Sequence, residues 1–129
     1  MARICGLAGV DPKDIPLLRA ALIAAAAPDL TVVAHLDVVA LRTLAPEILV
    51  VDIDSLKVDP LEMLRQLRFV LSDCVIVVHT ATIESSWGRA CHLAGASCVL
   101  SKEADESQLI SGFKRAIRTG CFTDPRFAA

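Results

Sequence analysis

The sequence predicts a single α/β domain, a doubly wound, five-stranded parallel sheet covered by five helices. Three observations predict it. Short apolar runs alternate with amphipathic segments along the whole chain. The connections between successive runs have room for one helix and little else, which is the pattern of βαβ units. The length of 129 residues is that of one domain with a core of its own.

Five apolar runs are predicted to form the strands, because each is short, rich in Val, Ile or Leu, and followed by a polar residue or a glycine. The run that closes on Asp52 is the clearest, since nearly continuous branched side chains are typical of a strand buried on both faces of a parallel sheet. The strand order is expected to be the flavodoxin-like 2-1-3-4-5. The expected strands cover residues 3–9, 30–34, 47–52, 74–79 and 98–100.

Five segments with apolar residues at helical spacing are predicted to form the helices. The first helix follows residue 12, the next three cover residues 38–44, 61–70 and 84–94, and the last ends before Gly120. Trp87, the only Trp, lies in the fourth helix and is expected to be partly exposed, with a partner contact and packing over the adjacent loop as equal interpretations. The inward residues of that helix are expected to be Ile83, Ala90, Leu93 and Ala94.

Composition and charge exclude several classes of protein. Hydrophobic residues make up 54% of the chain and charged residues 22%, which indicates a globular rather than a disordered chain. A net charge of −2 is too small for the chain by itself to hold a phosphate backbone. No apolar stretch approaches the ~18 residues that span a bilayer, and nothing predicts a signal peptide, so we expect a cytoplasmic protein without membrane contact. Five cysteines without a C-x-x-C pair favour buried, reduced thiols.

Polar side chains close three successive predicted strands. Asp52 ends the third apolar run, Thr80 follows the fourth and Lys102 follows the fifth. Because ligands of open α/β sheets bind beyond the carboxyl ends of the strands, we expect these side chains to converge. A carboxylate that attacks phosphorus, with a hydroxyl and an ammonium that bond the equatorial oxygens, makes a phosphoryl site. Asp52 is therefore the phospho-acceptor candidate, and Thr80 and Lys102 are the phosphoryl-binding candidates.

The motifs around these residues resemble the receiver domain of bacterial response regulators, from Arg3 to about Arg126. The resemblance implies the same three roles for Asp52, Thr80 and Lys102 in two-component signal transduction (a phosphorelay), with no enzymatic turnover. It also implies a homodimer, and a histidine kinase, another protein or a small ligand as the regulator. The matching segments are Pro46-Glu-Ile-Leu-Val-Val-Asp52-Ile-Asp54, Val75-Ile-Val-Val-His-Thr80-Ala81 and Val99-Leu-Ser-Lys102.

The last residues resemble the linker that follows receivers of the NarL/LuxR subgroup. Proteins of that subgroup continue into a helix-turn-helix DNA-binding domain, so DNA contact is expected only through such a C-terminal domain, which is absent from these 129 residues. We therefore expect residues 1–120 to form the receiver-like domain, and residues 121–129 to be a loose tail or the start of a linker.

The first departure from the receiver pattern concerns metal binding. Receivers hold Mg²⁺ with an acidic pair at the end of the first strand, where this sequence has Gly9-Val10. A divalent cation ordinarily offsets the repulsion between the attacking carboxylate and the phosphoryl anion. The remaining metal candidates are Asp11, Asp52 and Asp54, so Mg²⁺ is expected to bind weakly, and no other cofactor is expected.

Three further departures lie at the other strand ends. Val99 stands where receivers usually carry a Tyr or Phe that moves inward, and Glu103 stands where many carry a Pro with a cis peptide bond, so a trans loop is expected. Leu56-Lys57 and Pro60 stand where Pro-Gly and Gly are common. These departures predict a pseudo-receiver in which Lys102 pairs with Asp52. Such a domain would regulate transcription through dimerisation or an attached DNA-binding domain, without aspartyl phosphorylation; the alternative is a phosphorylatable receiver with a weakened Mg²⁺ site.

Two other interpretations use the same residues. The run through Asp52 also resembles the nucleophile motif of haloacid-dehalogenase-type phosphatases, which need a further acidic motif at a strand end after the Lys. Here the acids that follow Lys102 open a helix, where acids favour the helix dipole. A metal or redox cluster could be drawn from His79, Cys91, His92 and Cys98. Their spacings match no standard zinc pattern, so structural roles are expected for these four residues. A structural role is also expected for His35, a strand-end residue without partners.

Overall fold

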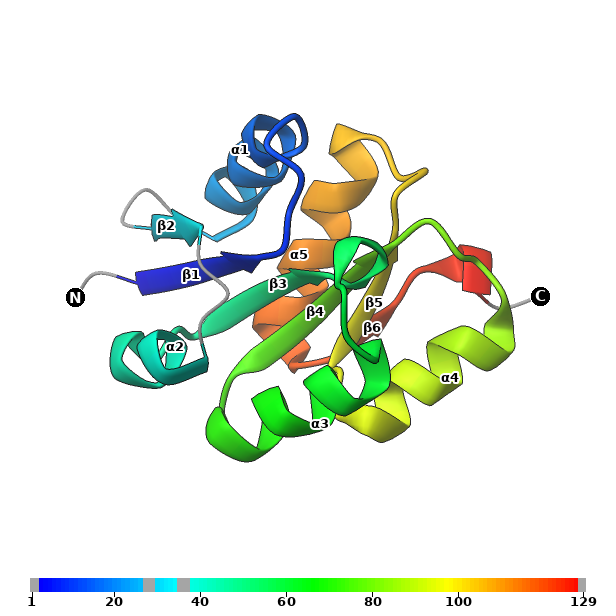
Figure 1. The fold of residues 1–129 in the computed structure, drawn as a ribbon. Coiled ribbons are helices and arrows are strands. Elements are labelled where there is room, and N and C mark those ends of the chain that lie inside the picture. Colours follow the sequence, from blue (N-terminus) through cyan, green and yellow to red (C-terminus); the bar gives the residue numbers. More distant parts are fainter. Residues whose placement is uncertain (1–2, 27–29, 35–37, 128–129) are drawn as a thin grey trace.

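The computed structural model describes residues 3–26, 30–34 and 38–127. They form one parallel sheet with helices on both faces, which confirms the predicted doubly wound class (Figure 1). The strands lie in the order β2-β1-β3-β4-β5-β6, and each neighbouring pair is parallel. The order 2-1-3-4-5 is therefore present, with a sixth strand added at one edge. His35 lies outside the described residues.

Helices and strands alternate along the chain, and most predicted boundaries hold to within one or two residues. The last helix ends at Gly120, as predicted, in a left-handed conformation with a φ of 80°. The elements are β1 (Arg3–Ala8), α1 (Ile15–Ala26), β2 (Leu30–Ala34), α2 (Val38–Leu44), β3 (Ile48–Asp52), the 3₁₀ turn η1 (Ile53–Ser55), α3 (Pro60–Val70), β4 (Val75–Thr80), α4 (Ser85–Ala94), β5 (Cys98–Ser101), α5 (Glu106–Thr119), β6 (Phe122–Thr123) and the 3₁₀ turn η2 (Pro125–Phe127).

Two apolar cores lie on opposite faces of the sheet. Helices α1 and α5 cover one face, where Val50 and Phe113 are fully buried. Helices α2, α3 and α4 cover the other, where Leu49 and Ile76 are fully buried (Figure 1). Because neighbouring strand residues point to opposite faces, a strand between two helical layers must be apolar throughout. Within the described residues, no helix has the length and apolar character needed to cross a bilayer.

The segment after residue 120, expected to be a loose tail, is packed against the domain over its described residues. β6 pairs with β5 and makes the sheet six-stranded rather than five-stranded. Phe127 is 3% exposed, and its ring lies so close to Gly88 of α4 that a Cβ on that glycine would come within 3.1 Å of it. A two-residue strand carries no periodicity, and the burial of Phe127 depends on a distant helix, so the sequence pattern did not indicate either.

Helix α4 turns a different face to the core than the one predicted. Leu93 is 89% exposed and Ile83 is 40% exposed, so the prediction for these two residues is wrong. Trp87 is half-buried against the core beneath α3 and α4, and its indole N–H is buried without a hydrogen-bond partner. The helix packs closely because its inward side chains are small. Those buried residues are Gly88, Cys91 and Ala94.

Arg68 of α3 ties three segments together, because its guanidinium donates hydrogen bonds to two loops at once. We expect Arg68→Ala to lower the free energy of unfolding by about 2 kcal/mol, since several partly buried carbonyl oxygens lose charged donors. Urea denaturation measures this. Arg65→Ala on the same helix is the control, because Arg65 makes an exposed ion pair with Glu62. Equal losses in the two variants would contradict the prediction. The acceptors of Arg68, at 2.8 to 3.2 Å, are the carbonyl oxygens of Gly95, Leu71, Ser72 and Cys74 and the hydroxyl of Ser97.

Candidate functional site

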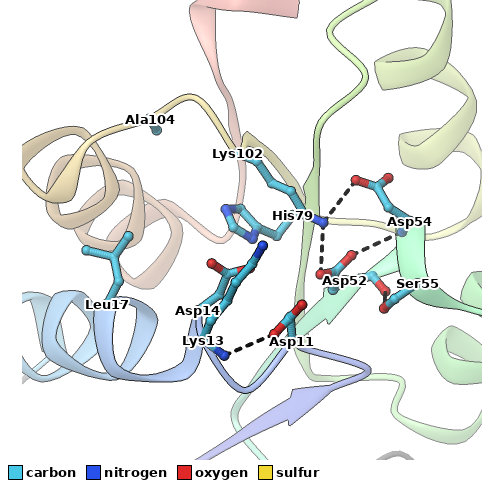
Figure 2. A pocket seen from close by; sticks show the side chains of 10 residues that line it. All are labelled: Asp11, Lys13, Asp14, Leu17, Asp52, Asp54, Ser55, His79, Lys102 and Ala104. Atoms are coloured by element: carbon cyan, nitrogen blue, oxygen red, sulfur yellow. Dashed lines mark hydrogen bonds and ion pairs between the residues drawn. The ribbon is translucent and has the colours of Figure 1, made fainter.

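Three predicted site residues meet at the carboxyl edge of the sheet. Asp52 ends β3, Thr80 ends β4, and Lys102 directly follows β5, with these three strands adjacent in the sheet. The Lys102 N–H donates to the Thr80 carbonyl at 2.8 Å, which fixes the two strand ends together. A pocket of about 450 Å³ opens beside Asp52 and Lys102, and Asp11 and His79 also line it (Figure 2). The structure therefore brings together the side chains that the sequence selected.

The Lys102 ammonium lies between two carboxylates (Figure 2). Its Nζ is 2.9 Å from Asp52 Oδ2 and 3.1 Å from Asp54 Oδ2. The Asp52 side chain is only 1% exposed, and a buried carboxylate is stable only when a partner compensates its charge. The internal pairing of Asp52 with Lys102 that the sequence predicts is present.

Asp54 is the residue whose role the sequence did not reveal. Its Oδ1 accepts a hydrogen bond from the Thr80 hydroxyl at 2.7 Å, and its Oδ2 accepts one from the Ala81 backbone N–H at 2.7 Å. Together with Lys102, these contacts give one carboxylate three donors from the ends of two strands. Thr80 and Lys102 are the two side chains predicted to bind a phosphoryl group, and both contact Asp54.

The turn after β3 directs Asp54 toward β4. Asp52 caps the 3₁₀ turn η1, because its Oδ1 accepts the Asp54 N–H at 3.1 Å. The Ser55 hydroxyl then donates to the Gly9 carbonyl, which joins this turn to the end of β1. The Asp-x-Asp spacing was the available signal for this cap. It does not say which way the second carboxylate points.

The charged side chains of the site shift one another's pKa values. Burial acts to raise the pKa of the Asp54 carboxyl, but hydrogen bonds from Thr80, Ala81 and Lys102 outweigh it and hold the pKa below its ordinary value. Burial acts to lower the pKa of the Lys102 ammonium, and its hydrogen bonds and charge contacts with Asp52 and Asp54 hold it above its ordinary value. Burial, and then the charge of Lys102, lower the pKa of His79, so this imidazole is neutral at pH 7.

The residues present do not fit the magnesium site that the receiver resemblance implies. Asp11 and Asp54 line one pocket with Asp52, but Asp11 accepts from the N–H of Lys13 at 3.0 Å, and Asp54 is taken by its three donors. Among the described residues, no group of three His, Cys, Asp or Glu side chains is arranged to hold a metal ion. The three metal candidates therefore do not form one centre.

Gly9 occupies a position where an acid would be strained. Its φ is +67°, and a Cβ there would lie 3.2 Å from the Asp52 carbonyl oxygen and 3.2 Å from Leu56. The loop that carries the metal-binding pair in receivers is therefore built here for glycine. Similarly, no cis peptide bond occurs in the described residues, so the bond before Glu103 is trans, as expected.

The residues on which the two other interpretations depend have structural roles. Asp105, one of the acids after Lys102, caps α5 in a capping box with Gln108, with hydrogen bonds of 2.8 and 3.0 Å. Cys91 and Cys98 are fully buried in different cores, on opposite faces of the sheet. The His92 ring bonds the Ala96 carbonyl and the Thr123 hydroxyl. The proposed metal or redox cluster is therefore not assembled.

The thiols follow the predicted pattern with one exception. Of the five cysteines, four are buried and free, and Cys121 is exposed. Burial raises the pKa of Cys5, Cys74 and Cys98 to about 12 and that of Cys91 to about 11. These four thiols are therefore protonated at pH 7 and poor nucleophiles.

A doubly wound sheet of this order, with Asp, Thr and Lys at three neighbouring strand ends, defines the receiver-type fold. Solved response-regulator structures share it. A LuxR-family two-component response regulator from Aurantimonas sp. SI85-9A1 matches with a TM-score of 0.79 and 22% identity, over 99% of this chain and 94% of that chain. The isolated REC domain of RcsB from Salmonella enterica serovar Typhimurium, in the presence of phosphomimetic BeF₃⁻, matches with a TM-score of 0.81 and 15% identity, over 99% and 97%.

The fold also occurs in a protein with a different description. A putative pilus assembly protein (CpaE) from Burkholderia thailandensis E264 matches with a TM-score of 0.71 and 18% identity, over 92% of this chain and 100% of that chain. No protein-family model matches the sequence. No curated protein matches it either. At these identities the likeness establishes the fold, and function must be argued from the site.

Proposed function

We propose that this chain is an atypical receiver domain that acts as a regulatory module without aspartyl phosphorylation and without enzymatic turnover. It regulates transcription in the bacterial cytoplasm by controlling homodimerisation or an attached DNA-binding domain. Its input is a protein partner or a small ligand instead of a histidine kinase. DNA is contacted only through a further domain.

One observation carries this proposal: each side chain that would accept or hold a phosphoryl group already has a partner, either within this set or in Asp54. Asp52 is buried and bound to Lys102, and Asp54 takes the Thr80 hydroxyl. A phosphodonor would have to displace these contacts without a fitting metal site to offset the repulsion between anions. Val99 supports the same conclusion, because it is fully buried and has no aromatic ring to move.

Acetyl phosphate and Mg²⁺ test this proposal directly. We expect the purified domain to show no mass gain of one phosphoryl group by intact mass spectrometry, while an ordinary receiver treated in parallel is modified. Asp52→Asn is the matched control, because it removes the acceptor and keeps the side-chain shape. A mass gain in the parent chain that disappears in Asp52→Asn would sink the proposal and establish the alternative, a phosphorylatable receiver with a weakened Mg²⁺ site.

A further inference from the structure

The Asp54 carboxylate is bound in the manner of a ligand. Three donors reach its two oxygens: the Thr80 hydroxyl at 2.7 Å, the Ala81 N–H at 2.7 Å and the Lys102 ammonium at 3.1 Å. They combine a hydroxyl, a backbone amide and a cation, the groups that stabilise an oxyanion. The Asp54 side chain remains 29% exposed, so it fills this donor set from the solvent side.

The donor set adjoins the acceptor candidate. One ammonium bridges Asp52 and Asp54, with N–O distances of 2.9 and 3.1 Å, so the two carboxylates lie within reach of a single cation. The receiver resemblance implies that a phosphoryl group on Asp52 would bind the same hydroxyl and ammonium through its oxygens. Asp54 therefore stands where those oxygens would be bound, with the same sign of charge and the same kind of acceptor atom.

Asp54 also joins segments that are otherwise separate at this edge. Through Thr80 it holds the end of β4, through Ala81 the start of the loop that leads into α4, and through Lys102 the end of β5. Thr82 continues the same network, since its N–H donates to the Thr80 hydroxyl oxygen at 3.2 Å. The first residues of the loop before α4 are thus bonded either directly to Asp54 or to its partner Thr80.

We infer that Thr80, the Ala81 N–H and Lys102 form a binding site for an oxyanion, and that the Asp54 carboxylate is its built-in occupant. Asp54 holds the loop before α4 in the anion-bound conformation with no attached phosphoryl group. This inference rests on the proposed function, in that a resident anion explains why the domain needs no phosphorylation. Small carboxylates and inorganic phosphate are the ligands that the vacated site would take.

Removal and replacement of the carboxylate test the inference. In Asp54→Ala, we expect the backbone amides of Ala81 and Thr82 to exchange with deuterium about tenfold faster than in the parent chain, because they lose charged or ordered partners. Formate, which replaces the missing carboxylate, or inorganic phosphate should restore the parent exchange rates and amide chemical shifts saturably, with a Kd on the order of 1 mM. NMR of the ¹⁵N-labelled domain measures both.

The controls separate anion binding from general effects. Asp73→Ala removes one exposed carboxylate remote from the site and should leave these amides unchanged, and sodium chloride at equal ionic strength should not restore Asp54→Ala. Unchanged exchange in folded Asp54→Ala, or no restoration by formate or phosphate, would overturn the inference. If Asp54→Ala does not fold, Asp54→Asn is measured instead, and amide signals of Ala81 and Thr82 identical to those of the parent would overturn it.

The outcome is independent of the test of the proposed function. The amide measurements use the unmodified chain and no phosphodonor, so they report on Asp54 whether or not acetyl phosphate can modify Asp52. A chain that is phosphorylated and also shows anion rescue would lose the proposed function and keep the inference. A chain that is neither phosphorylated nor rescued would lose the inference and keep the proposed function.

Discussion

Lys102→Met is expected to lower the free energy of unfolding by about 3 kcal/mol, because it removes the cation from two carboxylates, one of them fully buried. Asp52 is 1% exposed and would be left as an uncompensated charge, while methionine keeps most of the apolar stem of the lysine. The value lies toward the low end for broken buried ion pairs, since the Lys102 side chain is itself 26% exposed. Guanidinium denaturation at pH 7 measures the loss.

Two further variants make this prediction specific to the ion pair. Lys114→Met on the exposed face of α5 is the control and should change stability by no more than about 0.5 kcal/mol. Asp52→Asn combined with Lys102→Met should recover most of the loss, because the buried charge is then absent. A Lys102→Met variant as stable as the parent would mean that water, and not Lys102, compensates Asp52. The internally paired site would then lose its structural basis.

The sequence predicted the strand-end residues because their signal is local. An apolar run that closes on a polar side chain marks a strand and its end at once, and the parallel topology then places consecutive ends at one edge of the sheet. Asp52, Thr80 and Lys102 could each be read in this way. The short crossovers predicted a parallel sheet, and the strand order was expected by analogy with the flavodoxin-like fold.

The role of Asp54 could not be predicted, because it depends on the direction in which its side chain points and not on a sequence pattern. The residue lies two positions beyond β3, in a 3₁₀ turn whose geometry is set by the cap from Asp52 and by the Ser55 contact with Gly9. From sequence, Asp54 was a candidate metal ligand, and its contact with Thr80 was not predicted. The path of the turn directs its carboxylate to Thr80.

Non-local packing explains the other differences. The inward face of α4 is made of small side chains, so the apolar periodicity that identifies a buried helix face was carried in part by exposed residues, Leu93 above all. β6 is too short to show a pattern, and it exists because its backbone pairs with β5. For α4, the missing information lies in Phe127, a residue distant in sequence that fills the space beside Gly88.

Phe127→Ala is expected to lower the free energy of unfolding by about 3 kcal/mol, the cost of emptying a buried aromatic site. A loose tail or flexible linker would give no change. The segment connects the site with α4, since Asp124 accepts the Ser101 N–H at 3.1 Å next to Lys102, while Phe127 packs against Gly88. Cys121→Ala, an exposed position in the same segment, is the matched control and should stay within about 0.5 kcal/mol of the parent.

Phe127→Ala also tests whether the C-terminal segment couples α4 to the site. If the C-terminal segment transmits the state of the site, Phe127→Ala should also speed deuterium exchange at the Ser101 amide, because Asp124 loses the anchor that holds it. Loss of stability with an unchanged Ser101 amide would show that Phe127 only fills the core beneath α4. Loss of both would show that residues 121–127 couple the anion site to α4.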